Sequence, residues 1–271
     1  MSGAPCPSCP ATSIAELCWS PAATRDAFLG FLVPPGLLDY CGLVPGRWRE
    51  DGAGDFRWFP APDDGILRIE VWPQPGGGDP TLALELADTR NGHLEASWIV
   101  LNDLAGPRYH LDRDRDGTAL AIGGPCRSQG EELRALAAGL APNQVRPGLR
   151  LFRPLIERVE SLARGLGKRR LYVVPLAYHN AIKFEHYGFR YTYAGDAREL
   201  RWIDRQFRPG GFLRRRMDGS RPFRQPWMAD TIRGRSWAIR DGVLGRHWAA
   251  PRMVKELLCP APENTFPGGR W

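Results

Sequence analysis

The stretch LYVVPLAYHNAIKFEHYGFRYTY, from Leu171 to Tyr193, is the part of the sequence that decides the fold. Its first four residues form an apolar run with two β-branched valines, which is typical of a buried strand. Pro175 ends that strand, and a short amphipathic helix follows until Gly188, a residue type that commonly terminates helices. The three aromatic residues after this glycine alternate with polar residues, as they do in strands. We therefore expect a strand, a short helix and a second strand packed together.

A block of alternating apolar and polar residues precedes this stretch. Alternation over short runs is typical of half-buried strands, and tight turns such as Asn91-Gly92 connect strands in hairpins. We therefore expect an antiparallel meander. Its strands are predicted at 55–60, 66–72, 81–86, 93–101 and 108–112.

Helical periodicity marks the segments on either side of this block. Two short helices are predicted at 21–33 and 37–43, and each is followed by Pro and Gly residues that break it. Two more are predicted at 131–140 and 151–166. The last is the longest, because its apolar residues form a continuous helical stripe.

The chain divides into three parts on these patterns. Residues 201–271 carry fourteen Arg and one Lys against four Asp and two Glu, although the net charge of the whole chain is only +7. This asymmetry favours a solvated basic surface, and the alternative is an acidic protein or a nucleic acid as a partner of the basic segment. The parts are an N-terminal extension with short helices (1–54), an α/β domain (55–195) and an Arg/Trp-rich C-terminal appendage without long periodic segments, packed on that domain (196–271).

Composition and motifs exclude several classes of protein. No apolar run is long enough to cross a bilayer and the N-terminus does not resemble a secretory signal, so we expect a cytoplasmic protein without a membrane partner. The sequence lacks the nucleophile elbow of serine hydrolases, the Walker loop, the H-E-x-x-H zinc motif and the dinucleotide-binding fingerprint.

Two patterns raise the question of a metal, and for both we expect none. The spacing of Asp112, Asp114 and Asp116 matches the first half of a calcium-binding loop. Gly123, however, occupies the position where that loop needs a bidentate Glu. The cysteines of a cytoplasmic chain are expected to be free thiols. The alternative is a thiolate metal site formed by Cys6, Cys9, Cys18 and Cys41.

The order of antiparallel strands, long helix, strand, short helix and strand resembles the GNAT superfamily of N-acetyltransferases. Asn180, Glu185, Gly188 and Phe189 occupy places comparable to those in the family's N-x-x-A-x-x-x-Y-E-x-x-G-F helix. The resemblance covers about residues 60–195. It implies an α/β fold with a mixed, mostly antiparallel sheet flanked by helices. It also implies acyl transfer from a CoA or carrier-protein thioester to an amine on a small molecule or a protein.

In this family the coenzyme lies at the start of the long helix. Bare backbone amides and a helix N-terminus hold its pyrophosphate there, and its pantetheine arm pairs with strand edges where two strands splay apart. The resemblance therefore implies acyl-CoA or an acyl carrier protein as a partner. The matching positions for the coenzyme are Gln144, Val145, Arg146, Gly148, Leu149, Arg150 and Asn180.

Acyl transfer to an amine needs a base for the amine and an acid for the leaving thiolate. Phe184 stands where the family often has an acidic tyrosine, so other residues would supply the proton. The candidates are Glu95 as base, and His179, His186 and Tyr187 as the remaining titratable groups; each could instead be structural. If none is catalytic, the chain is a non-catalytic binding protein of the same fold.

Overall fold

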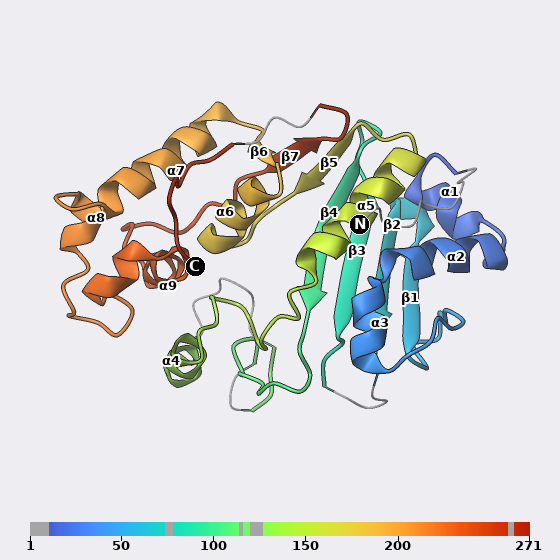
Figure 1. Ribbon diagram of the computed structural model, residues 1–271, viewed down its shortest axis with the longest axis horizontal. Helices are drawn as coiled ribbons and strands as arrows, with labels where there is room; N and C mark the ends of the chain where they lie inside the picture. Colours follow the sequence, from blue (N-terminus) through green and yellow to red (C-terminus); the bar gives the residue numbers. More distant parts are fainter. Residues whose placement is uncertain (1–10, 74–77, 114–115, 120–126, 260–262) are drawn as a thin grey trace. The chain divides into compact units, whose positions relative to one another are not determined.

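The computed structural model describes residues 11–73, 78–113, 116–119, 127–259 and 263–271, and the chain forms two compact units (Figure 1). Unit 1 contains the described residues within Met1–Ala105, Gly148–Val173 and Lys255–Pro260. Unit 2 contains those within Gly106–Pro147, Val174–Val254 and Ala261–Trp271. The long helix and the first strand of the opening stretch belong to unit 1, and the short helix belongs to unit 2.

Unit 1 is built on an antiparallel meander followed by one parallel strand. Strands β1 to β4 pair in chain order, each antiparallel to the next, and β5 pairs parallel with β4. This confirms a mixed, mostly antiparallel sheet and the first four predicted strands. The bounds are β1 Phe56–Ala61, the 3₁₀ turn η1 Pro62–Asp64, β2 Ile66–Val71, β3 Leu82–Asp88, β4 Leu94–Leu101 and β5 Arg170–Val173.

One face of this sheet forms the core of unit 1. Trp58, Ile69 and Leu84 stand in register on neighbouring strands and are almost fully buried. Burial of such side chains supplies the main favourable free energy of folding. Helices cover this face in Figure 1. They are α1 Ile14–Trp19, α2 Ala22–Leu32, α3 Pro35–Cys41 and α5 Phe152–Gly165.

Helix α5 confirms the predicted apolar stripe. Its side chains at the predicted positions are buried, from Leu155 to Ala163, and Leu166 follows directly after the helix. The end of strand β7 (Met253–Glu256) belongs to unit 1, where the amide of Leu257, which follows it, donates to the carbonyl of Arg169 at 2.9 Å and two ion pairs add to this contact. Lys255 Nζ lies 2.6 Å from Glu160 Oε1 of α5, and Arg170 Nε lies 2.8 Å from Glu256 Oε1.

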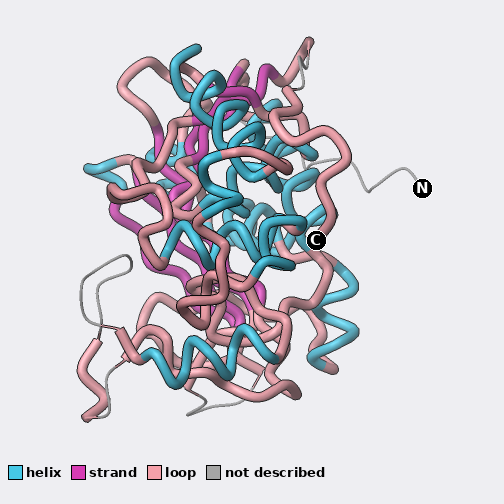
Figure 2. Tube along the Cα trace, turned by 90° about the vertical axis from the view of Figure 1, so that its left-hand side faces the viewer, coloured by secondary structure: helices cyan, strands magenta, loops and turns pink. Residues whose placement is uncertain are grey.

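Unit 2 is mainly helical, and loops connect its helices (Figure 2). The first half of β7 pairs antiparallel with β6, and α6 packs against α9. Trp237 of α9 is fully buried and its Nε1–H donates to the carbonyl of Leu140 at 2.8 Å. The bounds are α4 Gln129–Ala137, α6 Tyr178–His186, β6 Arg190–Tyr191, α7 Ala194–Phe207, α8 Phe212–Arg215, the 3₁₀ turn η2 Pro226–Asp230 and α9 Ile232–Arg240.

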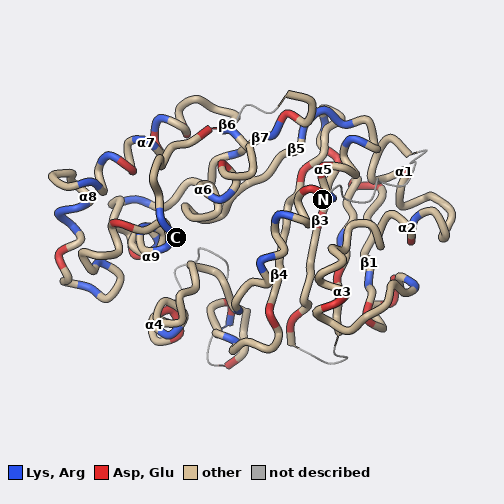
Figure 3. Tube along the Cα trace, in the orientation of Figure 1, with Lys and Arg blue, Asp and Glu red and all other residues tan. Residues whose placement is uncertain are grey.

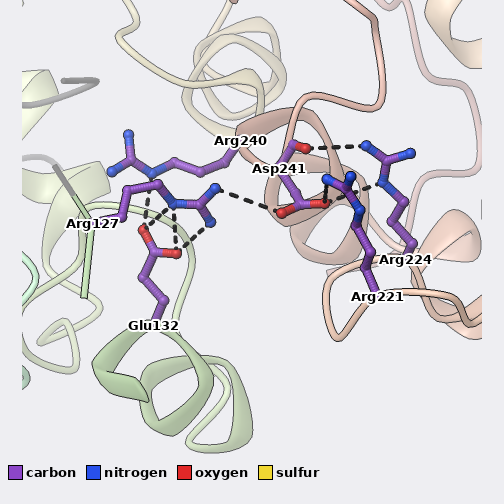
Figure 4. A network of polar contacts seen from close by, with 6 residues as sticks. All are labelled: Arg127, Glu132, Arg221, Arg224, Arg240 and Asp241. Carbon is purple, nitrogen blue, oxygen red and sulfur yellow. Dashed lines mark hydrogen bonds and ion pairs between the residues drawn. The ribbon is translucent and has the colours of Figure 1, made fainter. Parts of the chain in front are cut away.

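Arginine–carboxylate contacts tie the helices of unit 2 together, as Figure 4 shows. Buried Glu132 of α4 accepts hydrogen bonds from Arg127 and from Arg240 at the end of α9. Asp241 follows α9 and accepts one from Arg224 Nε at 3.1 Å. Two further guanidinium groups approach Asp241 at 3.6 and 3.8 Å, those of Arg127 and Arg221.

Three sequence-based predictions of local structure are wrong. Residues 108–112 form a loop, in which the amide of Tyr109 donates to the carbonyl of Val145, rather than a fifth strand. Residues 196–271 do contain long helical segments, α7 and α9. The apolar stripe of α7 is interrupted by Asp204, which is nevertheless buried because Arg235 pairs with it.

The third error is helix α1 (Ile14–Trp19), which lies before residue 21, where the first helix was predicted to begin. Ser13 caps this helix, since its Oγ accepts a hydrogen bond from the amide of Glu16 at 3.0 Å. Asp88 also accepts the amide of Ile14 at 2.8 Å. The second contact comes from β3, far along the chain, so the local sequence could not show it.

Candidate functional site

Strands β4 and β5 are paired over only two residues. Leu94 is opposite Leu171 and Glu95 is opposite Tyr172, whereas β4 continues to Leu101. In the part of the chain that the structure describes, residues 96–101 pair with β3 only. One edge of β4 therefore lacks a partner strand beyond Glu95.

A β-bulge lies at the point where the two strands part. Ala96 is opposite Leu86 and Trp98 is opposite Glu85, so Ser97 is the additional residue on β4. Its exposed side chain donates to Glu85 Oε1 at 2.7 Å. Bulges increase the local twist of a strand and redirect its edge. Here the bulge accompanies the divergence of β4 from β5.

The backbone groups on the open edge follow from the ladder. The amide of Asn102 donates to the carbonyl of Thr81 at 2.9 Å, so alternate residues of β4 face β3 from that end. The N–H and C=O groups of Ile99 and Leu101 consequently face away from β3. They form a short row of donors and acceptors that a ligand can pair with.

The segment before α5 reaches the end of this edge. A side-chain atom added at Gly148 would lie 3.7 Å from the carbonyl oxygen of Leu101, so the two backbones are close. Arg150 adopts a positive φ of 60°, which is uncommon for a residue with a side chain. Leu151 provides no side-chain cap for α5, and Arg150 and Arg153 are exposed at the helix start. Gly148, Leu149 and Arg150 thus lie in unit 1 with β4.

The other three residues of the predicted coenzyme loop lie in unit 2 and hold loops together. Gln144 Oε1 accepts the amide of Ala141 at 2.7 Å. The carbonyl of Val145 accepts the amide of Tyr109 at 2.8 Å, and Arg146 Nη1 donates to the carbonyl of Gly106 at 2.8 Å. The boundary between the units therefore falls inside this predicted loop.

Glu95 lies at the point where β4 and β5 part. It is half-buried, and its register partner is Tyr172. The ring of His93, two residues before Glu95, lies 5.9 Å from the ring of Tyr172. Burial lowers the pKa of His93, and the nearby Arg170 lowers it further. A carboxylate, an imidazole and a phenol thus share one region of unit 1, and only the pairing of the two strands reveals this.

His179 is in unit 2 and is buried against α9. Its Nδ1 lies 2.9 Å from Ser236 Oγ. Burial lowers its pKa to about 3, and Lys183 and Arg233 contribute to the same effect. His179 is therefore neutral near neutral pH, and its environment is that of a structural core residue.

The other site predictions in unit 2 differ in their exposure. Asn180 is half-buried in the first turn of α6. His186 is exposed at the last residue of that helix, and Tyr187 follows it as the half-buried C-cap. These three residues and His179 thus share one short helix, whereas Glu95 belongs to the other unit.

The residues that carry the family resemblance mainly shape the turn after α6. Phe184 is buried, and its ring lies 5.2 Å from that of Phe189. Gly188 has a φ of 85°, which glycine adopts without strain. Glu185 is buried and accepts hydrogen bonds from Tyr191 Oη at 2.5 Å and from the amide of Thr265 at 2.8 Å. Each has a packing or conformational role that needs no substrate.

No group of three or more His, Cys, Asp or Glu residues suited to a metal ion occurs within the described residues. Cys6, Cys9 and Asp114 lie outside those residues, and Asp112 accepts a hydrogen bond from Arg108 at 2.8 Å. None of the helices in the described ranges is both long and apolar enough for a membrane span.

No protein-family model matches this sequence, and neither the curated proteins nor the solved structures contain a match.

Proposed function

We propose that this chain is a GNAT-like acyltransferase that moves an acyl group from a CoA or carrier-protein thioester to an amine. The observation that carries the proposal is the open edge of β4 at Ile99 and Leu101, where β5 diverges after two residue pairs. The pantetheine arm common to both thioesters contains two amides. Such a chain can add to a strand edge through main-chain hydrogen bonds.

The start of α5 supports binding of the coenzyme phosphates next to that edge. The first amides of a helix have no partner within the helix, and the helix dipole favours an anion there. Gly148 brings bare backbone close to Leu101, while Arg150 and Arg153 add positive charge. The phosphates would therefore bind at one end of the edge and the arm would run along it.

Glu95 is the group best placed to act as base in this proposal. It would take a proton from the acceptor amine, directly or through a water molecule, as the nitrogen attacks the thioester carbonyl. The carbon–sulfur bond then breaks and the thiolate takes up a proton. Tyr172, the register partner of Glu95, is a proton donor in the same unit. Of the three donors predicted in unit 2, His186 and Tyr187 are accessible, whereas burial favours a structural role for His179.

Thermal unfolding with and without acyl-CoA tests the binding step. We expect acyl-CoA to raise the melting temperature, because a ligand that binds only the folded state stabilises it. Arg150→Glu should abolish the shift, and Arg47→Glu, an exposed arginine elsewhere in unit 1, should keep it. No shift with acyl-CoA or an acyl carrier protein would refute the coenzyme proposal.

A second pair of variants tests the strand edge itself. Ile99→Pro removes an amide that faces away from β3, a position where a strand tolerates proline. We expect it to fold and to lose the acyl-CoA shift. Ile99→Ala keeps the amide and should keep the shift.

The alternative is a non-catalytic binding protein of the same fold. The burial of Phe184 against Phe189, in place of an accessible tyrosine, favours it. Release of free thiol from acyl-CoA in the presence of amines separates the two functions. In an enzyme, Glu95→Gln should lose turnover and keep the acyl-CoA shift. Binding without turnover by the unmodified chain would support the alternative.

A further inference from the structure

Helix α7 of unit 2 turns one continuous face to solvent. Its opposite face is buried through residues from Ala197 to Phe207. The exposed positions fall at helical spacing, so they form one stripe. Arginines occupy most of it, as the recurring blue segments of α7 in Figure 3 show. The exposed residues after the first turn are Arg198, Arg201, Trp202 and Arg205, with Arg208 directly after the helix.

Two of these arginines have no partner among the described residues. Arg201 is paired with Glu263 at 2.7 Å and Arg208 is paired with Asp204 at 2.5 Å. Arg198 and Arg205 make no ion pair or hydrogen bond to any residue that the structure describes. Glu199, the carboxylate nearest in sequence to Arg198, is paired with Arg246. Two unneutralised guanidinium groups therefore stand on the exposed face.

Two exposed aromatic rings lie on the same face. Trp202 is 38% exposed and Tyr193, directly before the helix, is 66% exposed. A side-chain atom added at Gly195 would lie 2.1 Å from the ring of Tyr193, so this ring lies over the first turn of α7. Along the axis the order is Tyr193 ring, Arg198, Trp202, Arg205. With a rise of 1.5 Å per residue, successive members are separated by roughly 4.5 to 6 Å.

We propose that this face of α7 binds single-stranded nucleic acid. Aromatic side chains stack on unpaired bases of any sequence, and a basic groove or face holds the backbone between them. Rings and guanidinium groups alternate along this face, so one extended strand lying on it can meet both kinds of side chain. Tyr193 and Trp202 would stack on bases, while Arg198 and Arg205 would bind phosphates. This activity is independent of the proposed acyl transfer.

Other polyanions fit this face less well. An acidic protein surface needs the arginines but gives no reason for exposed rings beside them. An anionic membrane binds helices that direct an apolar face toward it, whereas the apolar face of α7 is turned into the core of unit 2. Trp202 between the two unpaired arginines and Tyr193 before them therefore favour unpaired bases.

Fluorescence anisotropy of labelled twelve-residue oligo(dT) and oligo(U) with the full chain tests the proposal. We expect binding at 50 mM salt that weakens as salt rises, since phosphate contacts release counterions. The double variant Arg198→Gln/Arg205→Gln should weaken binding at least about tenfold and reduce the slope of log K against log salt by about 1.4. Trp202→Ala should weaken binding roughly tenfold and leave that slope unchanged, and Trp202→Phe should restore it.

A matched control separates a site from general charge attraction. Arg47→Gln/Arg90→Gln removes the same charge from exposed arginines of unit 1 and should leave binding unchanged. Unchanged melting temperatures would verify that the variants fold. Equal losses in both double variants, or no binding to either oligonucleotide, would overturn the proposal. Binding to polyglutamate or to anionic lipid vesicles but not to the oligonucleotides would overturn it in favour of those partners.

Discussion

Units 1 and 2 differ in how polar groups take part in their interiors. The central face of the unit 1 sheet is apolar, with Ile69 and Leu84 in register and almost fully buried. The interior of unit 2 contains the ion pair between Asp204 and Arg235, whose side chains are each only 4% exposed. A buried ion pair offsets the cost of removing its charges from water only where both partners are well placed for hydrogen bonding. Unit 1 also has a largely buried pair, Lys168 and Asp88 at 3.0 Å. The pair in unit 2 is more completely buried, so unit 2 is expected to depend more strongly on a single charged contact.

The largest expected effect is the loss of Asp204. This carboxylate accepts from Arg235 Nη1 at 2.9 Å and also pairs with Arg208. Asp204→Ala leaves the buried guanidinium of Arg235 without its partner, which should destabilise unit 2 by about 3 to 5 kcal/mol. Hydrogen exchange of the α9 amides measures this, because it reports on unit 2 by itself.

The double variant Asp204→Ala/Arg235→Met is the control for that effect. It removes both charges, so it should recover a large part of the lost stability. Surface ion pairs typically contribute less than about 1 kcal/mol. If Asp204→Ala lowered the hydrogen-exchange protection of α9 by no more than that, the proposed difference between the two units would be wrong.

The corresponding change in unit 1 is a cavity. Leu84 is fully buried in β3, and Leu84→Ala should cost about 3 kcal/mol. The cost should be the same at low and high salt, since no charge is involved. Val44→Ala, at a side chain that is 81% exposed, should cost close to nothing. Hydrogen exchange of the β3 amides, measured at increasing urea concentration, gives the free energy of unfolding of both variants. A strong salt dependence of the stability lost in Leu84→Ala would contradict the comparison.

The pH dependence of unit 2 gives a smaller effect. Burial lowers the pKa of His179 to about 3, while the ordinary value is 6.5. Below pH 6.5 the unfolded chain binds a proton that the folded chain does not, so stability falls as pH falls from 6.5 toward 3. At pH 5 the loss should be about 2 kcal/mol.

His179→Asn removes this titration and serves as its test. Protection of the α6 amides should then change less between pH 7 and pH 5 than in the unmodified chain, even if the variant is less stable overall. An identical slope in both proteins would exclude His179 as the source. Exchange of the β2 amides should serve as a reference from unit 1.

The same contrast explains what the sequence could predict. Strands β1 to β4 and helix α5 follow from alternation and from an apolar stripe, which are local patterns. Helix α7 was missed because Asp204 interrupts its stripe, and the partner that permits its burial is Arg235, distant in sequence. The hydrophobic pattern of a single segment cannot show a partner that comes from a distant part of the sequence.

The candidate site was predictable in part for the same reason. Gly148 and Arg150 belong to unit 1, and Gly148 lies close to Leu101 at the end of β4; their part in coenzyme binding stays a prediction. Gln144 and Arg146 are their neighbours in sequence but belong to unit 2, because tertiary contacts divide the chain at this point. The proximity of Glu95 and Tyr172 depends on the register of β4 and β5, which no local pattern specifies.

The smallest predicted effect concerns how helices begin in the two units. In unit 1, Ser13 Oγ caps α1 by accepting a hydrogen bond from the amide of Glu16, as Thr231 Oγ1 caps α9 in unit 2 by accepting one from the amide of Gly234. Ser13→Ala should cost about 1 kcal/mol, and Ser20→Ala, at the exposed other end of α1, should cost less. Asp88 still accepts the amide of Ile14 in Ser13→Ala, so α1 should remain docked. Exchange of the α1 amides measures both variants. Complete loss of α1 protection in Ser13→Ala would mean that the local cap, and not the contact from β3, holds this helix on unit 1.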